Sequence, residues 1–120
     1  MIRNLVFFDC YFEEFVKNLS QKVRDKIGYV LFLMTVSERI PSKFLKHIEG
    51  TDGLFEIRIE FESNIYRLFC CFDDGKLIVL FNGFHKKSQK TPQTEIQKAL
   101  SIKKEYFKTK YSNVFDKPRT

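Results

Sequence analysis

The sequence has no tryptophan, three cysteines and two histidines among its 120 residues. Because tryptophan is absent, the 14 phenylalanines must supply most of the bulky side chains of the core. The cysteines are odd in number, two of them are adjacent, and no second pair exists for a zinc site, so neither a disulfide framework nor structural zinc is expected. We expect Cys10, Cys70 and Cys71 to be buried thiols in a reducing compartment.

Long apolar runs are also missing. No segment approaches the roughly 20 apolar residues that span a bilayer, and the first apolar run, at residues 5–8, is too short for a signal peptide. The sequence has no repeats and no low-complexity segment, and its 120 residues are enough for one domain but too few for two. We expect a cytoplasmic protein that binds no membrane, with a single domain over 1–113 and a frayed tail over 114–120.

Positive charge is in excess, and it is concentrated in one segment. The formal net charge is +6. Residues 85–110 contain eight lysines and two glutamates, whereas the rest of the chain has equal numbers of basic and acidic residues. Localised positive charge is typical of surfaces that bind phosphate backbones or acidic partners. A solvated lysine-rich helix is the alternative interpretation.

The pattern of apolar residues predicts an α+β fold with the element order β-α-α-β-β-β-α. Residues 2–8 are β-prone and predict a first strand. Apolar residues at helical spacing predict helices over 12–19 and 20–39, with Ser20 as the N-cap of the second helix and Pro41 just beyond its end. We expect these two helices to form an antiparallel hairpin that covers one face of the sheet.

The second half of the chain predicts an antiparallel meander. We expect residues 42–53 to be a connector and a last helix to run over about 93–111, because Pro92 can begin it. Alternating and continuous apolar patterns predict three strands, which we place at 55–61, 65–72 and 77–84. The sequence Asp-Asp-Gly-Lys at 73–76 is a strong signal for a tight turn between the last two.

Two-residue turns would align polar residues of the meander in one row. Arg58 would lie opposite Arg67, and Arg67 opposite Asn82, with Lys86 following on the same face. The row would belong to a polar face, so Arg67 is expected to contribute little to the core. Two arginines directly opposite each other repel unless something offsets the repulsion.

Two interpretations offset this repulsion. In the first, Glu56 and Glu60 neutralise the arginines in a solvated ion-pair network. In the second, the pair binds phosphate, which a guanidinium group holds through two parallel hydrogen bonds. We favour the second interpretation, because the row continues into the basic segment 86–91.

His85 is the histidine nearest to this row, and histidine is the commonest proton carrier at neutral pH. Strict alternation along the strand, however, sends His85 to the face opposite Arg67. His85 is therefore a candidate for proton transfer if the chain twists at Gly83, and otherwise a structural or exposed histidine.

Four short motifs follow one another in the sequence: LFEIRI at 54–59, IYRLF at 65–69, FHKKSQKTP at 84–92, and Glu95, Ile96 and Ala99 in the segment after them. In this order and at this spacing they resemble the phage-derived branch of HigB-type toxins in the RelE/ParE superfamily. Each motif alone is weak, but the ordered set is fairly specific. The resemblance covers about residues 1–111 and is sharpest over 54–99.

The resemblance implies a small RelE-like, microbial-ribonuclease-like fold with a concave face for RNA. It implies the toxin of a type II toxin–antitoxin system, which cuts messenger RNA, usually on the ribosome. It also implies a helix-turn-helix antitoxin as partner, through which the complex can bind operator DNA. The positions that carry over from the family are Arg58, Arg67, Lys86, Lys87 and Lys90.

The chemistry that we expect needs no metal and no cofactor, because RNA supplies its own nucleophile, the 2′-hydroxyl, and no carboxylate cluster resembles a two-metal nuclease site. The candidate catalytic residues are Arg58, Arg67, Lys86 and His85. The candidate residues for binding RNA or the ribosome are Lys87, Gln89, Lys90, Asn82 and Lys46. Two other classes stay open: a ParE-like inhibitor of DNA gyrase without nuclease activity, against which the retained arginines and lysines argue, and a plain basic module that binds RNA or protein.

Overall fold

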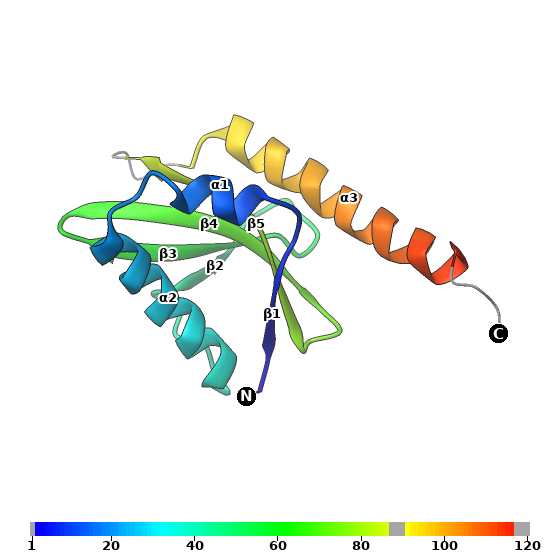
Figure 1. Ribbon diagram of the computed structural model, residues 1–120, viewed down its shortest axis with the longest axis horizontal. Coiled ribbons are helices and arrows are strands. Elements are labelled where there is room, and N and C mark those ends of the chain that lie inside the picture. The colour runs from blue at the N-terminus through cyan, green and yellow to red at the C-terminus, as the bar shows by residue number, and fades with distance from the viewer. Residues whose placement is uncertain (1, 87–90, 117–120) are drawn as a thin grey trace.

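A computed structural model describes residues 2–86 and 91–116 of the chain, and side chains over 2–85 and 91–111. Within these ranges the chain forms five strands and three helices in one mixed α+β unit (Figure 1). The elements are β1 (Asn4–Phe7), α1 (Tyr11–Val16), α2 (Gln21–Val36), β2 (Leu45–His47), β3 (Phe55–Phe61), β4 (Asn64–Asp73), β5 (Leu77–Lys86) and α3 (Gln93–Asp116).

The five strands form one sheet in the order β1-β5-β4-β3-β2. β1 runs parallel to β5, and the other neighbours are antiparallel. The predicted meander is therefore present as β3, β4 and β5, but the connector expected over 42–53 is wrong, because it contains β2. This strand of three residues is too short to show an alternating pattern, and its pairing with β3 holds it in place.

Each face of the sheet is covered by different helices (Figure 1). α1 and α2 lie on one face, where the apolar stripe predicted for α2 packs against residues such as Ile57 and Leu68. α3 lies on the other face, where Ala99 and Ile102 pack with Phe69. Successive residues of β4 thus enter opposite cores, as a strand requires. α1 packs on β5 and α2 on β3 and β1, so the expected hairpin is spread across the sheet.

All three helices end at residues other than those predicted from the sequence, and α1 ends at Val16 instead of residue 19. α2 begins after Ser20, whose side chain caps it as expected, but it ends at Val36 instead of residue 39. The guanidinium group of Arg3 donates hydrogen bonds to the carbonyl oxygens of Met34, Ser37 and Glu38, and thereby satisfies groups that a helix end leaves without partners. α3 continues to Asp116, so part of the expected tail is helical.

The three cysteines are free thiols, but they do not share one environment. Cys70 and Cys71 are buried as expected, and burial raises the pKa of Cys71 to about 11 and that of Cys70 further. Cys10 is exposed, which contradicts the expectation, because it lies in the turn that precedes α1. Both cores therefore contain an inert thiol.

A polar cluster ties the second half of α3 to the end of β4. The carboxylate of Asp73 is buried and accepts a hydrogen bond of 2.7 Å from the Tyr106 hydroxyl. Lys110 donates to both oxygens of the same carboxylate, at 2.9 and 2.8 Å. The hydrogen bond from Lys110, and then that from Tyr106, lowers the pKa of Asp73.

Of the helices described, none is both long enough and apolar enough to cross a membrane.

Candidate functional site

The register of the meander places the predicted row only in part. Arg58 lies directly opposite Arg67, as predicted, because Glu62 and Ser63 form a two-residue turn with positive φ angles of 49° and 66°. The predicted pairing of Arg67 with Asn82 is wrong, since Arg67 lies opposite Phe84. Two features shift the register: Asp73 pairs with Leu77, so the turn between β4 and β5 is one residue longer than expected, and a bulge follows between Leu68 and Cys70.

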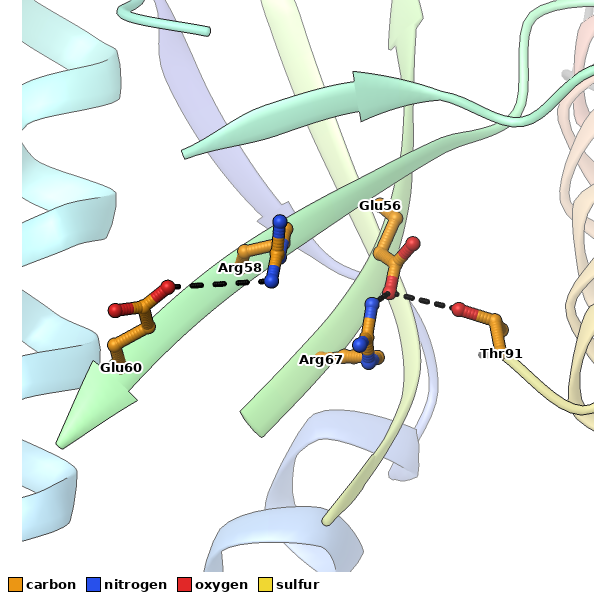
Figure 2. Close-up of polar contacts among 5 residues, drawn as sticks. All are labelled: Glu56, Arg58, Glu60, Arg67 and Thr91. Carbon is orange, nitrogen blue, oxygen red and sulfur yellow. Dashed lines mark hydrogen bonds and ion pairs between the residues drawn. The ribbon is translucent and has the colours of Figure 1, made fainter. Parts of the chain in front are cut away.

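Arg67 is a buried half of an ion pair. Its Nη1 atom lies 2.5 Å from Oε1 of Glu56, and the two side chains are 4% and 2% exposed. Thr91 donates a hydrogen bond of 3.0 Å to the same oxygen from the segment before α3, so three parts of the chain meet here (Figure 2). The sequence suggested Glu56 as a neutralising partner of the arginine row, and the structure pairs it with Arg67.

The Glu56–Arg67 pair lines a hollow of about 380 Å³ between β2, β3, β4 and the start of α3. Lys46 also lines it, because β2 pairs Lys46 with Glu56 and thereby brings the lysine to the same part of the sheet. We call this hollow the Arg67 hollow; its lining residues are Lys46, Ile48, Glu49, Glu56, Arg67, Thr91 and Ile96. It presents a fixed guanidinium, an ammonium and two carboxylates to a small polar ligand.

Arg58 does not line the Arg67 hollow, although it is the strand neighbour of Arg67. Its guanidinium group lies 3.9 Å from a carboxylate oxygen of Glu60, and its side chain is 32% exposed (Figure 2). It lines a second hollow, beside α2. The two candidate catalytic arginines therefore line two different hollows.

Asn82 and His85 are not among the residues that line the Arg67 hollow. Asn82 is buried at the bulge, and neither its amide nitrogen nor its amide oxygen has a hydrogen-bond partner in the described structure. His85 pairs with Tyr66 and stacks on its ring, with 4.5 Å between ring centroids, and its Nε2 lies 3.0 Å from Oδ1 of Asn64. Tyr66 belongs to the core under α2, so His85 is on the face opposite Arg67.

Of the basic segment 86–91, the structure describes only the two end residues, Lys86 and Thr91. Lys86 is the last residue of β5 and pairs with Ile65, which places it at the end of the strand that carries Phe84. Lys87, Gln89 and Lys90, which were predicted to bind RNA or the ribosome, lie outside the described residues, as does the side chain of Lys86.

Residues 14–104 match the family model described as Phage derived protein Gp49-like (DUF891). The chain belongs to the Gp49-like family. No curated protein sequence matches it. Among solved structures, the Gp49-like chain is similar to a chain of the RelB-RelE antitoxin-toxin complex from Methanococcus jannaschii, with 19% identity and a TM-score of 0.52, over 72% of this chain and 99% of that one. This likeness establishes a RelE-like fold, as the sequence motifs implied.

In this Gp49-like chain, no three histidine, cysteine, aspartate or glutamate side chains of the described part gather closely enough to hold a metal ion. The polar side chains that line the Arg67 hollow are those of Lys46, Glu49, Glu56, Arg67 and Thr91. Sequence reasoning missed Thr91 and Glu49 as lining residues. The Thr-Pro pair at 91–92 marked the start of α3, but only the fold shows that this start lies against Glu56.

Proposed function

We propose that this Gp49-like chain is the toxin of a type II toxin–antitoxin system. Its activity would be that of a metal-independent endoribonuclease that cuts messenger RNA on the ribosome. The observation that carries the proposal is Arg67, held by Glu56 in a hollow that Lys46 also lines, in a RelE-like fold. A guanidinium group fixed in this way suits a phosphate whose charge rises during the reaction.

The proposed reaction is attack by the 2′-hydroxyl of RNA on the adjacent phosphate. The bond from phosphorus to the 5′-oxygen breaks, and this oxygen takes a proton from water and leaves as a 5′-hydroxyl group, while the other product carries a 2′,3′-cyclic phosphate. Arg67 stabilises the phosphate oxygens, and Lys46 holds a neighbouring phosphate. Glu56 orients Arg67 and accepts a second hydrogen bond from Thr91. Of the lining carboxylates, Glu49 is the one outside the Arg67–Glu56 pair, and it would accept the proton of the 2′-hydroxyl. We assign no step to His85 or Asn82, given their positions.

We also propose an antitoxin, operator DNA and RNA as partners of the chain. The similar solved structure is an antitoxin–toxin complex, which supports an antitoxin partner here. We propose a helix-turn-helix antitoxin that carries the complex to operator DNA. Lys86, Lys87, Gln89 and Lys90 would contact messenger or ribosomal RNA. The free thiols suit the reducing cytoplasm.

The proposal is tested by incubating the purified chain with ribosomes and messenger RNA and measuring cleavage of the messenger RNA. Cleavage should persist in chelator and leave 2′,3′-cyclic phosphate or 3′-phosphate ends. Arg67→Lys keeps a cation beside Glu56 but loses the planar fork, and it should slow cleavage by about a hundredfold. The matched control is Arg39→Lys, at an exposed arginine outside the hollow, which should cleave normally.

Three results would count against the proposal. Ends with a free 3′-hydroxyl would mean another reaction, and equal cleavage by both lysine variants would remove Arg67 from it. An intact messenger RNA pool together with inhibited DNA supercoiling would identify a gyrase inhibitor instead.

A further inference from the structure

A second hollow, of about 680 Å³, lies at the edge of the sheet. β2 pairs with Phe55–Ile57, and within the described ranges no strand covers the edge of β3 beyond Ile57, where the Arg58 amide donates a hydrogen bond to the Phe44 carbonyl oxygen. α2 forms one wall of the hollow, and residues 41–44 form another. We call it the Arg58 hollow; the lining residues that matter here are Lys26, Tyr29, Lys43, Phe44, Arg58 and Glu60.

Positive charge from three elements converges on the Arg58 hollow. Lys26 comes from α2, Lys43 from the segment before β2, and Arg58 from β3. The single carboxylate among the lining residues, Glu60, is 72% exposed at its side chain and no closer than 3.9 Å to Arg58. The Nε atom of Arg58 is buried and has no hydrogen-bond partner in the described structure. Cations brought together with so little compensation favour an anionic ligand.

Aromatic rings stand beside these cations. Tyr29 is 54% exposed, although it is a large ring on a helix whose other face is buried. The Lys26 ammonium lies 5.9 Å from the centre of the Tyr29 ring, and the Lys43 ammonium lies 4.9 Å from that of Phe44. Cations for phosphates together with an open ring for a base are the combination that binds single-stranded nucleic acid.

We infer that the Arg58 hollow binds a nucleotide of single-stranded RNA that flanks the cleavage site. Tyr29 would stack on the base, and Lys26, Lys43 and Arg58 would hold its phosphates. Because Arg58 is directly opposite Arg67, a strand of RNA can pass from one hollow to the other across a single pair of residues. The identity of the ligand as RNA rests on the proposed function. An acidic protein segment would use the cations but not the exposed ring.

Binding of an oligoribonucleotide to the purified chain tests the inference. The probe is a fluorescent RNA strand of about 12 nucleotides. Its 2′-oxygens are methylated, so they cannot attack the adjacent phosphates and the probe stays intact. Tyr29→Ala should weaken binding about tenfold, as expected for the loss of one stacked base. Phe32→Ala is the matched control, because Phe32 is 52% exposed on the same helix but lines a separate hollow beside β1. The affinity of the Phe32→Ala variant for the probe should change less than about twofold.

The lysines provide a second measurement. Lys26→Ala should lower the slope of log affinity against log salt by about one, whereas Lys22→Ala, one turn earlier on α2 and outside the hollow, should leave it unchanged. Equal effects of Tyr29→Ala and Phe32→Ala would overturn the inference, as would an absence of binding by the unsubstituted chain. Loss of affinity for a partner protein, with RNA binding intact, would also overturn it.

Cleavage measured in parallel separates this inference from the proposed function. Binding that depends on Tyr29, without any cleavage, supports the nucleotide site and contradicts the ribonuclease. Cleavage by a Tyr29→Ala variant with unchanged affinity for the probe contradicts the nucleotide site alone.

Discussion

At the scale of single residues, Arg67 and Glu56 depend on each other. Both are nearly inaccessible to water, so each charge is stable only while the other compensates it. The expectation that Arg67 contributes little to the core is therefore wrong. A polar residue on an alternating strand can be buried when a helix and its preceding segment cover that face, and here α3 and Thr91 do so.

This dependence predicts that Arg67→Ala lowers the free energy of unfolding by about 3–5 kcal/mol, because Glu56 is left as a buried charge without compensation. Replacing both residues, as Glu56→Leu with Arg67→Met, should recover most of the loss. Urea denaturation measures both variants. An Arg67→Ala chain as stable as the unsubstituted one would show that Glu56 is hydrated. Activity assays on Arg67→Ala need this measurement beside them.

At the scale of elements, the Asp73 cluster holds α3 to the sheet. Asp73→Asn should lower the free energy of unfolding at pH 7 by about 1–2 kcal/mol and speed amide hydrogen exchange in the second half of α3. The matched control is Asp74→Asn, in the adjacent exposed turn, where asparagine tolerates the positive φ of 56°.

The pH dependence of this difference follows from the lowered pKa of Asp73. A carboxylate with a lowered pKa in the folded state stabilises the fold above its unfolded pKa of about 3.9, and this contribution is lost as the pH falls through the folded value. The stability gap between the unsubstituted chain and Asp73→Asn should therefore be constant near neutral pH and narrow below about pH 4. A gap that widens in acid would contradict the cluster.

The contact between α1 and β5 gives another prediction at this scale. A Cβ atom added at Gly83 would lie 2.5–2.7 Å from three atoms of the Phe15 ring. Gly83→Ala should therefore destabilise the fold by about 1–3 kcal/mol. Gly28→Ala, on α2, has nothing within 4 Å of its new Cβ and should be neutral or stabilising. Thermal unfolding compares the two, and equal melting temperatures would mean that α1 moves aside.

Most elements could be predicted from the sequence, because apolar spacing over six or more residues is a strong local signal. β2 could not, since three residues carry no period and pairing with β3 defines the strand. The pairing of Arg58 with Arg67 was predicted correctly, because it depends on one two-residue turn. The predicted pairing of Arg67 with Asn82 was wrong, because the turn between β4 and β5 is one residue longer and a bulge follows, and nothing in the local sequence marked either feature. The ion pair of Arg67 with Glu56 also required knowledge of which helix covers which face.

At the scale of the whole molecule, the proposed toxin should stop the growth of a bacterial host when it is expressed alone. Co-expression of an antitoxin encoded beside it should restore growth, because a bound partner would cover the RNA surface. Growth curves measure this, with Arg67→Lys as the variant of lowered activity. Normal growth with abundant soluble, unsubstituted protein would contradict the toxin assignment.

The Arg67 hollow draws on residues from Lys46 to Ile96, and its last contributions come from the segment that leads into α3. A chain under synthesis therefore lacks one wall of the hollow until that segment has emerged from the ribosome. A chain terminated before Thr91 also leaves Glu56 without its second hydrogen bond and Phe69 without the helix that covers it. A fragment that ends before Thr91 should therefore lack the activity proposed for the hollow, because neither the Glu56 carboxylate nor the wall formed by Thr91 and Ile96 is in place.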